Sequence, residues 1–106
     1  MESTKSRGAV SLRIPRLVGT RNAARKLVED AVDVREGTAV HLLPRDVIDS
    51  SSSFVDELLV RLEELQVGPI IVFPASEEFK QQVREAASDH GYDNVRFASP
   101  QELRLL

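Results

Sequence analysis

Four consecutive serines, residues 50–53, are the side chains in this chain whose types and spacing best suit chemistry. They follow Asp49 and stand directly before an apolar and polar pattern that is typical of an amphipathic helix. Hydroxyls at the start of a helix lie among unpaired backbone N–H groups, near the positive end of the helix dipole, and this environment favours an anion. The sequence therefore predicts a place where a phosphate carried by a serine would be stabilised.

The same serines also have a purely structural interpretation. Ser53 is predicted to be the N-cap of the helix, with Asp56 three residues later as the acidic partner of a capping box. Serines at helix starts commonly do no more than cap. Capping alone and a functional serine therefore both stay open at this point.

Other candidates for catalysis are few. His41 falls inside a predicted strand and His90 at the end of a predicted helix, and neither is close in sequence to a nucleophile. The chain has no cysteine, no glycine-rich phosphate loop and no metal-binding histidine pair. We therefore expect no enzyme activity, no metal and no cofactor. A serine hydrolase or transferase is the least favoured alternative, because no base lies within sequence reach of the serines.

A phosphate-accepting receiver domain is also rejected. Asp46 and Asp49 follow the second predicted strand, where such a domain carries its acceptor. The metal-binding acids that should follow the first strand are missing, and so is the lysine after a late strand.

Charge and hydropathy narrow the class of partner. Residues 1–26 hold seven basic residues and one acid, whereas the remainder holds seven basic and sixteen acidic residues, for a net charge of −3. The acidic remainder and the five aromatic residues argue against a nucleic-acid partner. No apolar run approaches the roughly 20 residues that span a bilayer, and residues 1–8 lack the apolar core of a signal peptide. We expect a cytoplasmic protein that makes no membrane contact.

The periodicity of the apolar residues predicts strands that alternate with helices. We expect one α/β domain over residues 9–106 behind a lead-in of residues 1–8, with a four-stranded, mainly parallel sheet in the order βαβαβαβα. The predicted strands cover residues 10–14, 39–43, 69–74 and 95–97, the last near a sheet edge. The predicted helices begin after Thr20, Ser53, Ser76 and Ser99, and end near Arg35, Gln66, Gly91 and Leu105.

The segment of residues 51–58, Ser-Ser-Ser-Phe-Val-Asp-Glu-Leu, resembles the SSSFADEL-type signature of STAS-like domains of unknown function. These domains are relatives of the STAS family of anti-sigma factor antagonists. The turn at residues 19–21 and the closing segment 97–103 are also similar to that group, and the resemblance covers residues 9–106. It implies a STAS-like sandwich fold.

The resemblance also implies a non-enzymatic regulatory module that binds a protein partner. By analogy with the antagonists, a histidine-kinase-like ATPase would act as a serine kinase on Ser53, or on Ser52 beside it. Phe54 stands where the antagonists have glycine, and Asp56 and Glu57 add negative charge that would oppose a phosphate. On this interpretation we expect the partner to contact the serine loop and the polar face of the helix, through Asp49, Ser50, Ser51, Phe54, Asp56, Glu57 and Arg61. The alternative is a constitutive interaction domain without a switch, and the sequence predicts no oligomeric state.

Overall fold

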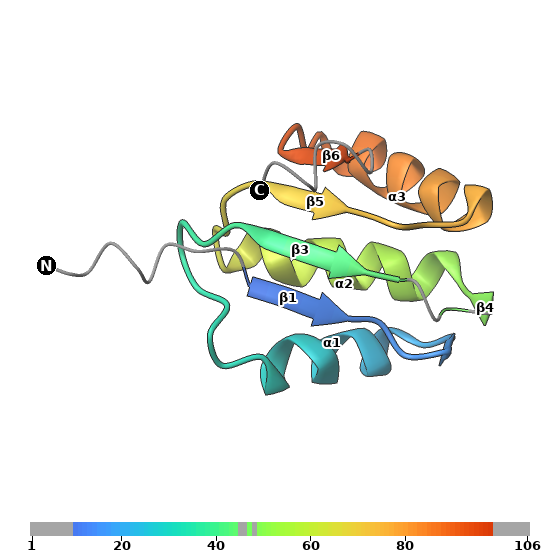
Figure 1. Ribbon diagram of the computed structural model, residues 1–106, viewed down its shortest axis with the longest axis horizontal. Coiled ribbons are helices and arrows are strands. Elements are labelled where there is room, and N and C mark those ends of the chain that lie inside the picture. Colours follow the sequence, from blue (N-terminus) through green and yellow to red (C-terminus); the bar gives the residue numbers. More distant parts are fainter. Residues whose placement is uncertain (1–9, 45–46, 48, 99–106) are drawn as a thin grey trace, which may run out of the picture.

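A four-stranded parallel sheet forms one layer of the protein, as the sequence predicted (Figure 1). The computed structural model describes residues 10–44, 47 and 49–98. Each strand of the sheet pairs in parallel with its neighbour, in the order β1-β3-β5-β6, so β6 lies at an edge as expected. The strand bounds are β1 Val10–Arg13, β3 Val40–Leu43, β5 Ile70–Val72 and β6 Val95–Phe97.

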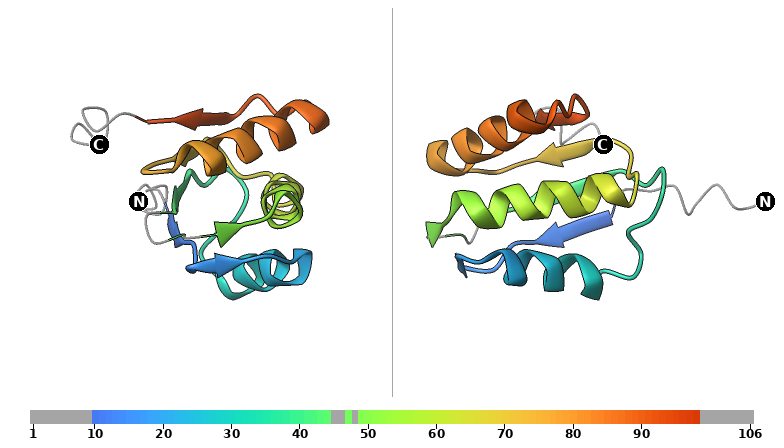
Figure 2. Two further views of the ribbon diagram at one scale, coloured as in Figure 1. Left: turned by 90° about the vertical axis from the view of Figure 1, so that its right-hand side faces the viewer. Right: turned by 180° about the vertical axis from the view of Figure 1, so that it is seen from behind.

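Three helices form the second layer, and all of them lie on one face of the sheet (Figure 2). They are α1 (Arg21–Asp30), α2 (Ser52–Glu64) and α3 (Glu77–His90). The central helix α2 packs against α1 on one side and α3 on the other. The predicted caps Thr20 and Ser76 are confirmed, each accepting a hydrogen bond from the backbone N–H three residues later.

The core fills the space between the sheet and the helices. Leu12, Leu42 and Val72 lie in register across three strands and are 5%, 0% and 1% exposed. They belong to one buried cluster with the apolar stripe of α2, which includes Phe54 and Leu58. Helix α2 has more fully buried side chains than α1 or α3, because it is covered by the sheet and by both neighbouring helices.

The prediction that the first helix runs to about Arg35 is wrong, since α1 ends at Asp30. The N–H of Ala31 bonds back to the carbonyl of Val28, and the backbone then leaves the helical region. Val32, which lies within the predicted helix, is 81% exposed, while Val34 turns inward and is 6% exposed. The β-branched valines and Asp33 are weak helix formers, so burial of Val34 outweighs continuation of the helix.

Two elements were not predicted from the sequence. Leu17–Val18 (β2) and Asp49–Ser50 (β4) pair in parallel as a separate two-stranded sheet. Two residues are too few to show a strand periodicity. This pairing brings the start of the serine run beside the turn that precedes α1. The Phe73–Pro74 peptide bond is cis, also unpredicted.

Some predictions lie outside the described residues, namely the lead-in of residues 1–8 and the closing helix expected at residues 100–105. Among the residues that are described, no helix has the length and apolar character needed to cross a membrane.

Candidate functional site

The helix after the serine run begins earlier than predicted, and its N-cap is Ser51 rather than Ser53. The Ser51 hydroxyl accepts a hydrogen bond from the Phe54 N–H at 3.0 Å and donates one to the Gly19 carbonyl at 3.0 Å. Strand β4 ends at Ser50, and Ser51 keeps the extended backbone that is usual for an N-cap, so the helix itself begins at Ser52. The predicted capping box is therefore absent, because the residue three positions after the cap is Phe54 and not Asp56.

This shift leaves Ser52 and Ser53 on the surface. Both are exposed in the first turn of α2, and among the described residues their hydroxyls have no hydrogen-bond partner. Ser50, in contrast, is only 9% exposed. Its hydroxyl donates to the Gln82 side chain at 2.6 Å, and the Gln82 amide donates to the Ser50 carbonyl at 3.0 Å. Ser52 and Ser53, the two candidate phosphorylation sites, are thus the two serines of the run whose hydroxyls make no hydrogen bond within the described residues.

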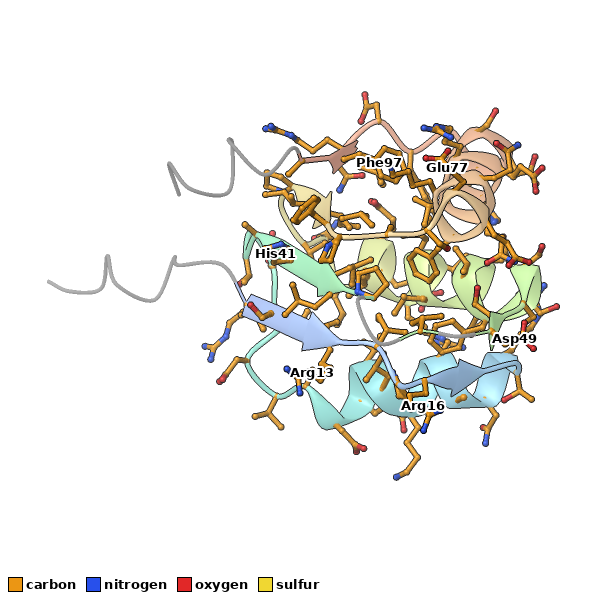
Figure 3. The ribbon with its side chains drawn as sticks, turned by 45° about the vertical axis from the view of Figure 1, so that its right-hand side comes forward. Arg13, Arg16, His41, Asp49, Glu77 and Phe97 are labelled. Atoms are coloured by element: carbon orange, nitrogen blue, oxygen red, sulfur yellow. The ribbon has the colours of Figure 1, made fainter. Side chains whose placement is uncertain are left out.

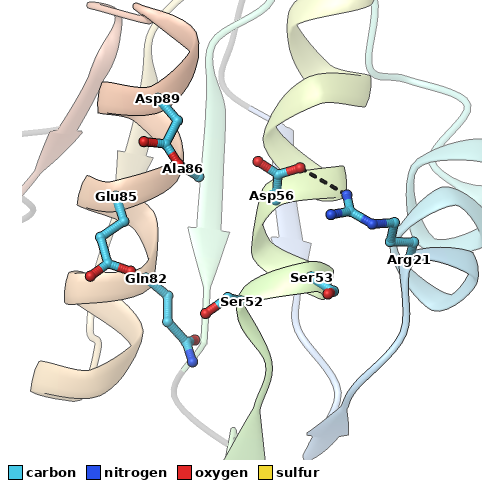
Figure 4. A pocket seen from close by; sticks show the side chains of 8 residues that line it. All are labelled: Arg21, Ser52, Ser53, Asp56, Gln82, Glu85, Ala86 and Asp89. Carbon is cyan, nitrogen blue, oxygen red and sulfur yellow. Dashed lines mark hydrogen bonds and ion pairs between the residues drawn. The ribbon is translucent and has the colours of Figure 1, made fainter.

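A pocket of about 220 Å³ opens beside these serines, between α2 and α3 (Figure 4). Ser52 lies on the α3 side of the first turn and Ser53 on the side of Arg21 from α1. The side of the pocket opposite the serines is formed by α3. The lining side chains are Arg21, Ser52, Ser53, Asp56, Gln82, Glu85, Ala86 and Asp89.

Asp56 joins all three helices at this pocket. One carboxylate oxygen accepts from the Arg21 guanidinium at 2.8 Å, and the other lies 2.7 Å from Nε2 of His90. The hydrogen bond from Arg21 holds the pKa of Asp56 below its ordinary value, with His90 acting in the same direction and burial opposing it. Asp56 is therefore a carboxylate with fixed partners, and its side chain is 25% exposed.

Glu57 makes a second junction, one residue further along α2. Its Oε2 accepts from Arg61 at 2.8 Å and from Arg25 of α1 at 3.1 Å, and its Oε1 lies 3.5 Å from Arg21. The bonds from Arg61 and Arg25 hold the pKa of Glu57 below its ordinary value, against the effect of burial. The sequence placed Glu57 on the polar face of the helix, but it is 7% exposed, because arginines from two helices cover it.

Some residues of the predicted contact surface are exposed, and others are buried. Asp49 is exposed, and the side chains of Asp56 and Arg61 are partly exposed, so these residues are open to a partner. Phe54 is fully buried. Ser50 and Glu57 point into internal contacts, and Ser51 caps the helix. The structure thus removes Phe54 from the predicted contact surface, since its ring belongs to the core.

The histidines do not form a catalytic group with the serines. His90 is engaged with Asp56 and stacks on Tyr92, with ring centroids 5.2 Å apart. His41 lies on β3, far from Asp49, the residue that directly precedes the serine run (Figure 3). Its Nε2 is buried without a hydrogen-bond partner. Within the described ranges, no group of three or more histidine, aspartate or glutamate side chains could hold a metal ion.

Sequence reasoning missed the residues that the other helices bring to the site, above all Arg21, Gln82 and His90. They lie more than 30 positions from the serines or acids that they contact. The one available signal was the isolated basic residue directly after the Thr20 cap. Comparison of the chain with family models, with curated proteins and with solved structures finds no match.

Proposed function

We propose that this protein is a non-enzymatic interaction module of STAS-like type, whose binding surface at the start of α2 is controlled by phosphorylation of Ser53, with Ser52 as the second acceptor. A protein partner would contact the exposed first turn of α2 and the adjoining edge of the pocket. A kinase of the histidine-kinase-like ATPase class would supply the phosphate.

The observation that carries this proposal is the free state of Ser52 and Ser53. Ser51 already caps the helix, so neither of the next two hydroxyls is needed for folding. Both are exposed at the N-terminus of helix α2, where the unpaired backbone N–H groups favour an anion. Phe54, which replaces the glycine of the antagonists, is buried, so its ring presents no bulk to an approaching kinase.

Arg21 makes Ser53 the better acceptor. Its guanidinium lines the same pocket and lies on the same side of α2 as Ser53, whereas Ser52 faces Gln82 and the acidic side chains of α3 (Figure 4). A phosphate on Ser53 would compete with Asp56 for this arginine, because a doubly charged phosphate attracts a guanidinium more strongly than a carboxylate does. Release of Asp56 would weaken the junction between the three helices, so modification would alter charge and surface shape together.

Mass spectrometry of the protein purified from its native cells tests the proposal. We expect one phosphate on the peptide that contains residues 50–53, located on Ser53, and its loss in Ser53→Ala. Ser88, an exposed serine of α3 outside the pocket, is the internal control and should stay unmodified. Unmodified protein across growth conditions would contradict the switch and favour a constitutive interaction domain.

A second experiment tests the binding surface independently of the phosphate. A photo-crosslinking amino acid at Ser53 should yield a discrete adduct with a protein in native cells, and the same residue at Ser88 should not. Ser53→Asp should reduce formation of the adduct from a crosslinker at Asp49. Equal adducts from positions 53 and 88 would contradict a binding surface at the start of α2.

A further inference from the structure

Strand β1 is an edge of the four-stranded sheet, and among the described residues it pairs only with β3. The N–H groups of Val10 and Ile14 donate to backbone carbonyls at the two ends of β3, at 2.8 and 3.0 Å. Successive residues of a strand direct their N–H and C=O groups to opposite sides, so those of Ser11 and Arg13 point away from the sheet. Within the described residues these outward groups form no hydrogen bond. They are the groups that another extended chain would satisfy.

A cavity of about 310 Å³ lies along this edge, and we call it the β1 edge groove. It is lined by all four residues of β1. Because successive side chains of a strand point to opposite faces, a cavity that touches all four lies beside the strand and not over one face. The other side of the groove is formed by the last turn of α1 and the residues after it, namely Leu27, Asp30, Ala31, Val32 and Asp33. The groove therefore lies where the helix-facing side chains of an additional strand would pack.

The apolar surface of the groove is incompletely covered by the described residues. Val10, Leu27 and Ala31 pack against the core but stay partly exposed. Val32 is 81% exposed, more than any other large hydrophobic side chain in the part of the chain that the structure describes. Exposed apolar side chains gathered at a cavity are typical of an interaction surface. Apolar side chains on an added strand would bury them.

The two ends of the groove carry opposite charges. Helix α1 runs opposite to β1 (Figure 1), so the end of the helix lies beside the start of the strand. Asp30 and Asp33 are exposed there and make that end acidic. Arg13 is exposed at the end of β1, on the face of the sheet opposite the helices because it alternates with the buried Leu12. Neither Arg13 nor Asp33 forms an ion pair within the described ranges, so both charges are available to a partner.

We propose that the β1 edge groove binds an extended segment of a partner protein, which adds to the sheet as a strand antiparallel to β1. Its backbone would bond the outward groups of Ser11 and Arg13. Two apolar side chains, two positions apart, would face the apolar side of the groove. A basic side chain would lie beside Asp33, and an acidic one would pair with Arg13 across the strands. The groove lies on β1 and the end of α1, so the proposal does not depend on phosphorylation of Ser53.

Two other occupants fit the groove less well. Residues 1–9 contain only Met1 and Ala9 as apolar residues, so this segment folded back on β1 would leave the apolar surface uncovered. A second copy could offer its own edge strands, but their helix-facing side chains, such as Leu12 and Phe97, already pack in its own core. The occupant with the right chemistry is therefore a separate extended segment.

An NMR titration of the unphosphorylated full chain with the peptide Glu-Val-Thr-Val-Thr-Lys, blocked at both ends, tests the proposal. In antiparallel pairing its glutamate lies opposite Arg13, its first threonine lies opposite Ser11, and its valines face α1. At saturation, solvent exchange of the Ser11 and Arg13 amides should slow by about tenfold or more. The amide of Leu12, which points to β3, should change little.

N-methylation of the peptide separates strand addition from other modes of binding. A methyl group on the nitrogen of the first threonine removes a bond to Ser11 and should weaken binding by about tenfold or more. The same group on the nitrogen of the second valine points away from β1 and should have little effect. Equal losses at both positions would overturn the strand pairing, and absence of binding at millimolar peptide would overturn the proposal.

Charge reversal tests the direction of the added strand. Asp33→Lys should weaken binding several-fold at low salt, and a peptide with glutamate in place of lysine should recover it. Glu36→Lys makes the same change at an exposed acid outside the groove and should bind like the wild type. Failure of this recovery would overturn the antiparallel arrangement. Slow exchange of the Ser11 and Arg13 amides in the free protein would overturn the partner, because residues 1–9 or a second copy would then cover the edge.

Discussion

Ser51 and Ser53 stand two positions apart, yet their surroundings give them different roles. The Ser51 hydroxyl satisfies a helix N–H and ties the helix start to the carbonyl of Gly19. Ser53 has neither contact within the described residues. Ser51→Ala should therefore lower the free energy of unfolding by about 1 kcal/mol, and Ser53→Ala should change it by no more than about 0.5 kcal/mol. Urea unfolding at neutral pH measures both, and a larger loss for Ser53→Ala would return the capping role to that residue.

Gly68 is required by its surroundings. A Cβ at this position would lie 2.9 Å from the carbonyl oxygen of Gly37, which is backbone and cannot rotate away. Gly68→Ala should therefore destabilise the protein by about 1–3 kcal/mol through overpacking. Gly19→Ala is the matched control, because a Cβ there meets nothing within 4 Å. Thermal unfolding of the two variants makes the comparison, and equal melting temperatures would show that the loops at residues 37 and 68 can move apart.

At the scale of the elements, two adjacent carboxylates of α2 connect the helices. Asp56 bonds Arg21 and His90, and Glu57 bonds Arg61 and Arg25. Each carboxylate has a pKa below its ordinary value of 3.8 or 4.5, so the folded state favours the ionised form. Their contribution to stability is fully present above the ordinary pKa values and is lost as the pH falls through the lower values of the folded state. Stability should consequently fall in acid, below about pH 4.

Substitution of Glu57 checks this origin of acid sensitivity. Glu57→Gln keeps the shape but removes the charge that holds Arg61 and Arg25, so it should destabilise the protein at pH 7 by on the order of 1 kcal/mol. The difference from the wild type should narrow between pH 7 and about pH 3, because the stabilisation by the wild-type carboxylate is lost as the pH falls through its lowered folded-state pKa. Urea unfolding at both pH values provides the measurement, with Glu29→Gln on exposed α1 surface as control. A difference that does not depend on pH would assign the effect to packing.

At the scale of the whole molecule, what could be predicted from the sequence is what repeats along it. Apolar alternation and helical periodicity predicted the four parallel strands and three helices, and local cap chemistry predicted Thr20, Ser76 and Gly91. Features made by distant contacts were not predicted. The end of α1 depends on the burial of Val34, and the burial of Glu57 depends on an arginine 32 positions earlier.

For the same reason, the position of the serine site could be predicted, but the role of each serine could not. The run of serines and the helix behind it are local, so the position of the site could be read from the sequence. Which serine caps and which are free depends on β4, a strand of two residues that exists only because β2 pairs with it. Arg21 and Gln82 reach the site from other helices, and no spacing in the chain relates them to the serines.

The arrangement of the layers predicts how stability is distributed. Helix α2 is covered by the sheet, α1 and α3, and β3 is paired on both edges, so these elements should open only when the whole domain unfolds. The β2–β4 pair consists of two residues on each strand, and β6 is paired on one edge only. Native-state hydrogen exchange should show amides of α2 and β3 protected by the full free energy of unfolding, and amides of β2 and β4 exchanging orders of magnitude faster. The β2–β4 pair would then open without loss of the core, and the kinase of our proposal would meet Ser53 beside a locally mobile segment. Equal protection of β4 and α2 would mean that the β2–β4 pair opens only when the core unfolds. Phosphorylation of Ser53 would then have to act on a rigid surface.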